Sequence, residues 1–182
     1  MHFIAALRLL LGASGADNRI SGVAAFMNLL EERLPPVDTV HAVAVTKSGR
    51  SGTIAISFGT EFKSGLEIEI VTTKGAVIWN PRGVKTVTKD PSTGEKVESE
   101  DKYPNYDSGV KAEVAQFARS IAEGKVEADA KQSPSEALGD LEVIQALLES
   151  GKAGGLLKRI PEDIAVPVSG EGGGDTVYMT GH

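Results

Sequence analysis

The sequence of 182 residues contains no cysteine, which excludes disulfides, thiolate nucleophiles, zinc–thiolate sites and iron–sulfur clusters. It also has no unbroken apolar run near the roughly 18 residues that are needed to cross a bilayer. The apolar stretch at residues 3–11 is interrupted by Arg8 and has no basic segment before it, so its spacing favours an amphipathic helix over a secretion signal. The lack of cysteine is compatible with a reducing compartment, and we expect a cytoplasmic protein.

The chain also has fewer basic than acidic residues. The chain has 19 Lys and Arg against 25 Asp and Glu, a formal net charge of -6, and a pI near 5.1. Nucleic acid and anionic membranes both require a concentrated positive field, so neither is expected as the main partner. A chain of this length with 41% hydrophobic and 24% charged residues is typical of one globular domain with its own core.

Between residues 19 and 100, short β-rich segments alternate with turn signals. The glycines in 47–52 permit the positive φ of a hairpin loop, so the segments on either side should pair. Residues 29–34 equally suit a helix. The segment 95–100 is highly charged, as expected of an edge strand. The expected strands are 19–30, 39–46, 53–62, 66–72, 76–79, 84–88 and 95–100.

Three segments have helical spacing. They are residues 3–11, a helix that opens near Asp107 and Ser108 and stops at Gly124, and a helix that opens at Ser133 and ends at Gly151. In the third, Ser133 is a suitable N-cap, Pro134 suits the first helical position and Glu136 completes a capping box. The order of elements predicts an α+β fold with a large open, predominantly antiparallel sheet of six or seven strands, helices packed on one face, and no Rossmann domain. We expect a single domain over residues 1–168 and a flexible Gly-rich tail over 169–182.

Motifs that bind nucleotides or metals are absent from the sequence. The glycines at 172–174 lack the lysine and the serine or threonine of a P-loop, and no G-x-G-x-x-G links a strand to a helix. The chain alone is therefore expected to bind no nicotinamide or flavin cofactor. Its histidines are scattered, with none at i, i+4 from another, so no metal site is expected.

The histidines differ in what their positions suggest. His182 is terminal and uninformative, and His41 lies in a predicted strand, where a structural role is favoured. His41 could be combined with Ser57 and Asp38 into a hydrolase triad, but no G-x-S-x-G elbow accompanies Ser57. His2 immediately precedes an apolar helix, where an imidazole could face a cleft and act as an acid, a base or a hydrogen-bond donor. From position alone such a histidine is more often inert, and the resemblance described below makes His2 the catalytic candidate.

Clustered carboxylates are the remaining candidates for acid–base chemistry. Glu67 and Glu69 form one set, and Glu98, Glu100 and Asp101 form another. Charge on the outer face or the edge of a strand is the usual way in which a sheet stays soluble. We therefore interpret both sets as solvated surface.

Several segments taken together resemble one known family. They are HFIAALRLLLG (2–12), LPPVDT (34–39), KSG (47–49), SFGT (57–60), SGVKAEV (108–114) and QSPSEAL (132–138). In this order they are similar to the C-terminal domain of the Gfo/Idh/MocA (glucose-fructose oxidoreductase / inositol dehydrogenase) oxidoreductases, especially fungal-type members. The resemblance runs from His2 to about Gly151.

The resemblance implies specific roles. Members of the family have an N-terminal Rossmann domain that binds NAD(P), followed by an α+β domain whose sheet helps to form the substrate pocket and often the oligomer interface. His2 matches a family histidine that takes part in substrate binding or proton transfer. The aspartate and glycines before that histidine would precede residue 1, and the lysine of the family's E-K-P motif has no counterpart here. NAD(P) would be used only if a longer chain supplied a Rossmann domain.

Three hypotheses of function follow. The first is a free-standing small-molecule-binding domain that holds a carbonyl, sugar-like or polyketide-like substrate, either binding it only or acting as a cofactor-independent isomerase, cyclase or lyase. The second is the substrate-binding and oligomerisation half of an NAD(P)-dependent oxidoreductase. The third is a non-catalytic module that dimerises through the broad sheet. The resemblance also implies a homodimer or higher homo-oligomer through the sheet face.

Overall fold

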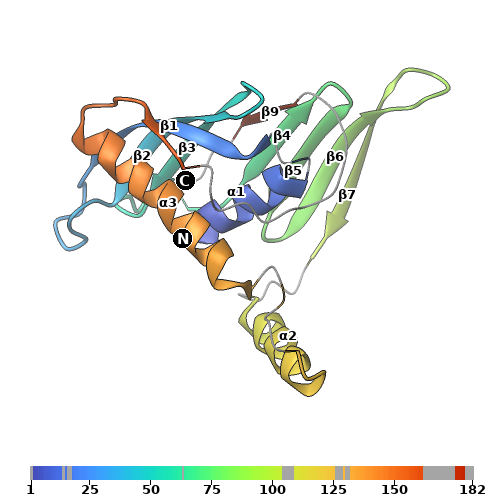
Figure 1. The fold of residues 1–182 in the computed structure, drawn as a ribbon. Helices are drawn as coiled ribbons and strands as arrows, with labels where there is room; N and C mark the ends of the chain where they lie inside the picture. The colour runs from blue at the N-terminus through green and yellow to red at the C-terminus, as the bar shows by residue number, and fades with distance from the viewer. Residues whose placement is uncertain are drawn as a thin grey trace.

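The computed structural model describes residues 2–13, 15, 18–62, 64–103, 109–125, 129, 132–161 and 175–178. These residues form three helices and nine strands (Figure 1). In chain order they are α1 (His2–Ala13), β1 (Ile20–Asn28), β2 (Thr39–Thr46), β3 (Ser51–Ser57), β4 (Ile68–Thr72), β5 (Gly75–Asn80), β6 (Gly83–Lys89), β7 (Lys96–Lys102), α2 (Val110–Ala122), α3 (Pro134–Lys152), β8 (Lys158–Arg159) and β9 (Asp175–Tyr178).

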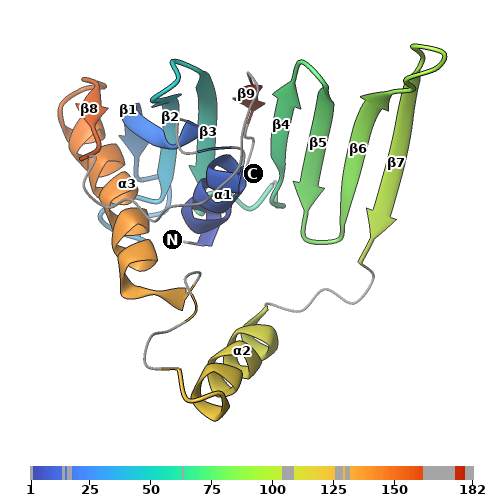
Figure 2. The same cartoon turned by 45° about the vertical axis from the view of Figure 1, so that its right-hand side comes forward.

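The strands form one nine-stranded sheet in the order β7-β6-β5-β4-β9-β3-β2-β1-β8 (Figure 2). All neighbouring pairs are antiparallel except β3 and β9, which are parallel. The seven expected strands correspond to β1–β7, and the charged β7 lies at one edge as predicted. The predicted α+β fold with a large, predominantly antiparallel sheet is therefore confirmed.

The C-terminal part of the chain adds two strands that the sequence does not predict. β8 pairs with Gly22 and Val23 of β1 and forms the other edge of the sheet. β9 falls within the stretch 169–182, for which a flexible tail is expected, and it lies between β3 and β4. The rest of that stretch lies outside the described residues, as does His182.

The core lies between one face of the sheet and the helices α1 and α3. Side chains that alternate along each strand point to this face, because successive residues of a strand face opposite ways. Leu7 of α1, Val23 of β1 and Val143 of α3 are each no more than 2% exposed. Burying one such side chain stabilises the fold by about 1.5–3 kcal/mol. The core residues are Ile4, Leu7, Leu11, Ile20, Val23, Ala25, Ala42, Ala44, Ile54, Ile68, Val143, Ala146 and Leu147.

The helix α2 does not take part in this core. It stands away from the sheet, whereas α1 and α3 lie directly against one face (Figures 1 and 2). The expectation of helices on one face therefore holds for α1 and α3, and α2 extends beyond them. None of the helices in the described part of the chain is long and apolar enough to cross a membrane.

A polar contact joins α1 to α3 beside the core. The guanidinium of Arg8 pairs with the carboxylate of Asp140 and also donates to the backbone carbonyl of Glu136 at 2.9 Å. Both charged side chains are largely buried, with 17% of Arg8 and 10% of Asp140 exposed. Gly139 makes the approach possible, because a Cβ at that position would overlap the guanidinium. The contact fixes the position of α1 along α3.

We expect Arg8→Met to lower the free energy of unfolding by about 3 kcal/mol, because it leaves the buried Asp140 carboxylate unpaired. Arg33→Met is the matched control, since the Arg33 side chain that pairs with Glu31 is 85% exposed. An exposed pair of this kind contributes about 0–1 kcal/mol. Urea unfolding measures both variants, and equal effects would show that the contact between α1 and α3 does not hold the helix in place.

Candidate functional site

A cavity of about 300 Å³ opens between the start of α1, β3 and the segment that leads into β4. Phe3 and Ile4 of α1 form one wall, residues 54–58 form the second, and Thr60 with residues 64–68 forms the third. The cavity arises where β3 and β4 are no longer joined through β9. β9 pairs with Gly52 and Thr53 of β3 and with residues 69–72 of β4, and the cavity is lined by residues of β3 and of the approach to β4 just beyond these pairs.

The lining is mainly apolar and carries a few polar groups. The rings of Phe3 and Phe58 stack with their centroids 6.0 Å apart and an interplanar angle of 28°. Isoleucines from α1, β3 and β4 extend the apolar surface. Polar groups come from the hydroxyl residues Ser57, Thr60 and Ser64 and from Glu67, which is exposed to solvent. Such a site suits a small molecule with an apolar face and several hydroxyl or carbonyl groups.

His2 is the first residue of α1 and is exposed, and it directly precedes Phe3, which lines the cavity. Its imidazole is therefore carried by the element that forms one wall. His2 itself is not among the lining residues, and its catalytic role stays a prediction.

The β3 wall is held by a hydrogen-bonded network centred on Asp38. This carboxylate is buried, with 5% of the residue exposed, and it accepts hydrogen bonds from the N–H groups of Leu30 at 3.0 Å and Glu31 at 2.7 Å. It also accepts one from the hydroxyl of Thr39 at 2.9 Å, and that hydroxyl lies 2.7 Å from the Ser57 hydroxyl. The network therefore links the loop before β2 to the cavity wall.

Gly59 packs directly against this carboxylate. A Cβ at position 59 would overlap the Asp38 carboxyl group, so the close approach requires glycine. The N–H of Gly59 donates to the Ser57 hydroxyl at 3.3 Å. Phe58 lies between Ser57 and Gly59, and the network thus fixes the ring that stacks on Phe3.

The same hydrogen bonds keep Asp38 ionised. Burial acts to raise its pKa, but the N–H groups of Glu31 and Leu30 and the Thr39 hydroxyl together stabilise the carboxylate more strongly, so the pKa of Asp38 lies below its ordinary value of 3.8. The carboxylate is a structural acceptor, and its bonds are directed at backbone and at Thr39.

The hydrolase triad of His41, Ser57 and Asp38 that the sequence could suggest is not assembled in the structure. His41 is exposed on β2, opposite Ala55 of β3. No hydrogen bond joins His41 to Ser57 or Asp38, and all three residues lie in the described part of the chain. The Ser57 hydroxyl is instead engaged with Thr39 and Gly59. In the described part of the chain no group of three or more His, Asp or Glu side chains could hold a metal ion.

The two carboxylate sets have different surroundings. Glu98 and Glu100 lie exposed on the edge strand β7 and pair with Lys85 at 2.7 Å and Lys102 at 3.4 Å, as expected of solvated surface. Asp101 is exposed on the same strand. Glu67 is exposed too, but it lines the cavity, which alternation along the sequence did not indicate.

Sequence reasoning also missed the aromatic pair. Phe3 and Phe58 carry no signal in the sequence beyond their place in the segments 2–12 and 57–60 that resemble the family. Their pairing depends on how α1 lies across β3, and no local pattern reveals that. The SFGT segment was the available signal, since Ser57, Phe58 and Thr60 all line the cavity.

Comparison with known proteins places this architecture in a family. Residues 1–158 match the model of the Gfo/Idh/MocA group, described as the C-terminal alpha/beta domain of an oxidoreductase family. The chain belongs to this family. A curated relative, "Dehydrogenase FPY6" of Fusarium mangiferae, is 46% identical over 160 residues, which are 88% of this chain and 44% of the relative. The chain therefore spans less than half the length of this relative.

Solved structures agree with the assignment. An oxidoreductase from Thermotoga maritima is 26% identical with a TM-score of 0.67, over 87% of this chain and 42% of its own. A levoglucosan dehydrogenase, solved with NADH and levoglucosan, is 15% identical with a TM-score of 0.65, over 79% of this chain and 45% of its own. At that identity the second match shows the fold alone.

The residues of this family member do not by themselves fit a dinucleotide. A Rossmann site needs a glycine-rich turn from a parallel strand into a helix, so that the helix N-terminus meets the pyrophosphate. In the described residues, the cap of α3 is the Ser133 side chain, which accepts from the Glu136 N–H, and no such glycine-rich turn precedes it. Cofactor binding in this family would depend on a further domain.

We expect Asp38→Asn to lower Tm at pH 7 by more than Glu32→Gln, which changes an exposed carboxylate in the same loop. An amide cannot match the carboxylate as an acceptor for two N–H groups and a hydroxyl. Because the folded pKa is lowered, the contribution of Asp38 is complete above its ordinary pKa of 3.8 and is lost as the pH falls through the lower folded value.

The variant should accordingly lose part of the acid sensitivity of the parent. As the pH falls below the ordinary pKa of 3.8, the Tm of the parent should fall more steeply than that of Asp38→Asn. Thermal melts followed by circular dichroism at several pH values measure this, and parallel curves for the two proteins would contradict it.

Proposed function

We propose that this chain is the substrate-holding domain of a Gfo/Idh/MocA oxidoreductase and that its ligand occupies the cavity beside α1. The observation that carries the proposal is the joint formation of that cavity by the start of the helix that bears His2 and by β3. The ligand is a small cyclic compound with hydroxyl or carbonyl groups. A nicotinamide, where one takes part, is held by another domain, and this chain supplies binding, orientation and proton handling.

Two kinds of contact would select such a ligand. The stacked rings of Phe3 and Phe58 offer an apolar surface to one side of a sugar-like or polyketide-like ring. The hydroxyls of Thr60 and Ser64 and the carboxylate of Glu67 can hydrogen-bond its hydroxyl groups. Buried apolar area supplies most of the affinity, and the polar groups fix the orientation.

His2 would handle the proton in this arrangement. An imidazole can act as a proton donor or acceptor, and His2 precedes Phe3, which lines the cavity. A carbonyl or hydroxyl group of the ligand that projects past Phe3 would come within its reach. The same geometry serves a cofactor-independent isomerase, cyclase or lyase, and turnover without added NAD(P) would distinguish that activity.

We expect levoglucosan and a hydroxylated aromatic ketone, used as two probes of the proposed class, to bind the chain, at least one of them measurably by isothermal titration calorimetry. Phe58→Ala should weaken binding by about tenfold, because it removes the stacking partner of Phe3. Phe62→Ala is the matched control, since Phe62 is 92% exposed and is not among the lining residues. His2→Gln should leave binding within about threefold of the parent and abolish turnover in the assembled enzyme.

Binding that is equal in the Phe58→Ala and Phe62→Ala variants would place the ligand elsewhere. Unchanged turnover in His2→Gln would remove His2 from the reaction while leaving the cavity as the binding site. The two parts of the proposal therefore fail separately.

A second function, assembly, is favoured by the outer face of the sheet. Phe26, His41 and Val43 alternate with core residues of β1 and β2, so their side chains lie on the face opposite α1 and α3. Phe26 is 63% exposed and Val43 is 47% exposed. We propose that this face pairs with a second copy of the chain, as isologous interfaces commonly do.

We expect the chain to be a dimer by light scattering at micromolar concentration and Val43→Glu to shift it toward monomer, because the charge would be buried at the interface. Val97→Glu is the matched control. Val97 has a similar exposure of 46%, but it lies on the edge strand β7, opposite Thr88, which shares the side of the sheet that faces the helices. A monomeric parent, or equal effects of the two variants, would contradict this interface.

A further inference from the structure

The cavity beside α1 has the form of a slot for one more stretch of strand. It is lined by residues 54–58, at the end of β3, and by residues 64–68, which lead into β4, and both runs are unbroken. A cavity on one face of a sheet would be lined by alternate residues, because successive side chains of a strand point to opposite faces. The consecutive lining therefore indicates that the cavity opens in the plane of the sheet, between the two backbones.

The backbone edge of β3 faces this slot. The N–H of Phe58 donates to the carbonyl of Asp38 at 2.9 Å, on the side of β2. Because the backbone groups of successive residues point to opposite sides of a strand, the N–H and C=O of Ala55 and Ser57 point away from β2 and toward the slot. Within the described residues no strand pairs with them there. Such an edge is where a further strand adds to a sheet.

The opposite wall is also suited to strand pairing. Leu66 forms an isolated β-bridge that belongs to none of the pairings between the described strands. Where β9 separates β3 from β4, their backbones lie two strand spacings apart, about 9–10 Å. The slot continues directly from that point, so its width at this end matches one extended backbone.

β9 ends where the slot begins, and its direction leads into it. Figure 2 shows β9 between β3 and β4. Tyr178 lies opposite Thr53 of β3, to which β9 is parallel, and opposite Glu69 of β4, to which it is antiparallel. The next residue in the same register would lie between Ile54 and Ile68, where the lining of the cavity starts on both sides.

We propose that the cavity is a strand-binding slot and that its occupant is Met179–His182, the segment that follows β9. These four residues lie outside the described part of the chain. In the register of β9 they would extend from Ile54 to Ser57 along β3 and from Ile68 to Gly65 along the other wall. They would thus span nearly the whole of both lining runs.

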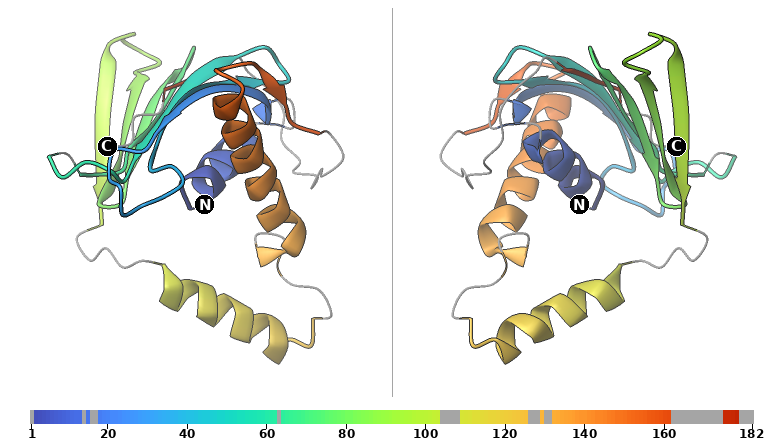
Figure 3. Two further views of the ribbon diagram at one scale, coloured as in Figure 1. Left: turned by 90° about the vertical axis from the view of Figure 1, so that its left-hand side faces the viewer. Right: turned by 90° about the vertical axis from the view of Figure 1, so that its right-hand side faces the viewer.

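The residue types of this segment suit the register. Met179 would share the face of Ile54, which is a core residue. Thr180 would lie on the opposite face, directly across from Glu67, whose carboxylate can accept a hydrogen bond from the hydroxyl. Gly181 would return to the face that curves over α1 (Figure 3), where the lack of a side chain leaves room for the first turn of that helix.

This inference concerns access to the cavity, and its statement about the ligand rests on the proposed function. A small molecule in the cavity and a strand formed by residues 179–182 would use the same space, so each excludes the other. The apparent affinity for the ligand is then reduced by the fraction of molecules in which the slot is open. The segment would therefore restrain binding from within the chain.

The experiment compares the full chain with Thr180→Pro, because proline lacks an N–H and does not fit a strand that is paired on both sides. Thr180→Val is the matched control, since valine keeps the branched shape and the strand preference of threonine. We expect the amides of Ala55 and Ser57 to exchange at least about tenfold faster in Thr180→Pro than in the parent and in Thr180→Val, measured by NMR. A chain shortened to end at Tyr178 should behave as Thr180→Pro does.

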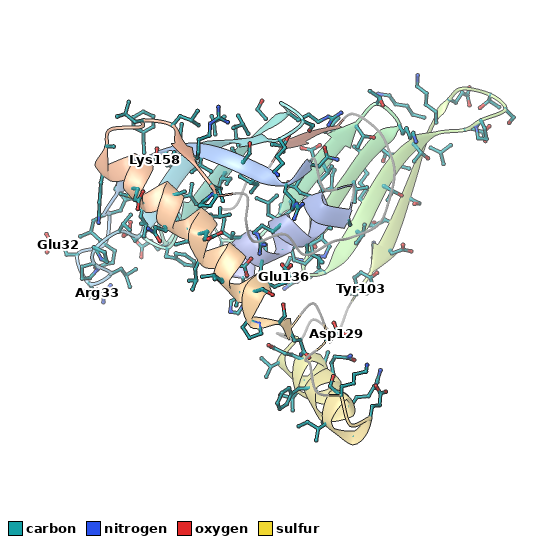
Figure 4. The ribbon with its side chains drawn as sticks, in the orientation of Figure 1. Glu32, Arg33, Tyr103, Asp129, Glu136 and Lys158 are labelled. Carbon is teal, nitrogen blue, oxygen red and sulfur yellow. The ribbon has the colours of Figure 1, made fainter. Side chains whose placement is uncertain are left out.

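The amide of Val23 is the internal reference. Val23 is 0% exposed and pairs with Lys158 (Figure 4), at the edge of the sheet away from the slot. Its exchange should be the same in every variant, and if one variant fails to fold the other decides. Equal exchange of Ala55 and Ser57 in the parent and in the folded variants would overturn the proposal. Protection that rises with protein concentration would assign the strand to a second copy and also overturn it.

Levoglucosan and the hydroxylated aromatic ketone are titrated into the same samples. We expect a probe that binds the parent to bind Thr180→Pro about tenfold more tightly. Equal affinity would show that strand and ligand do not compete, and would overturn that part of the inference. Faster exchange in Thr180→Pro without binding of either probe removes the proposed ligand and leaves the strand in the slot. Probe binding with equal exchange removes the strand and leaves the proposed function standing.

Discussion

The packing of α1 against both the sheet and α3 is the contact on which the rest of the structure depends. Leu7 is 1% exposed in the core, and Arg8, the next residue, pairs with Asp140 of α3. One residue therefore anchors the helix to the sheet, and its neighbour sets its position along α3. The first turn of α1 lies over β3 as a result, and this brings Phe3 against Phe58.

The cavity follows from this placement together with the division of the sheet. Within the described residues, β3 beyond its β9 pairs has no adjacent strand on that side, and the start of α1 covers the resulting space from the helix side. The Asp38 network holds the β3 wall, because Gly59 admits the carboxylate and Ser57 is hydrogen-bonded to Thr39. A site assembled from two ends of secondary structure and one loop can change its specificity through the loop while the scaffold stays the same.

The two faces of the sheet have different surroundings. The face toward α1 and α3 holds the core and borders the cavity, and the opposite face presents Phe26 and Val43 to solvent. α2 lies on the helix side but contributes its apolar residues to neither. Of the residues of α2, only Gln116 and Ser120 are not exposed, and the described part of the chain leaves its apolar side uncovered.

Local patterns in the sequence determined most of the fold. Period-two alternation, glycine-rich turns and the capping residues Ser133 and Glu136 predicted β1–β7 and the three helices, because these signals act over a few residues. The helical spacing of Val110, Val114, Phe117 and Ile121 was equally clear, but periodicity reports only that a helix has an apolar side and not what covers it. The tertiary structure alone decided that this side faces solvent, that Phe3 meets Phe58 across 55 positions of sequence, and that Glu67 borders a cavity. These relationships depend on how distant elements pack, and that packing is set by the summed burial of the core instead of by any neighbouring residues.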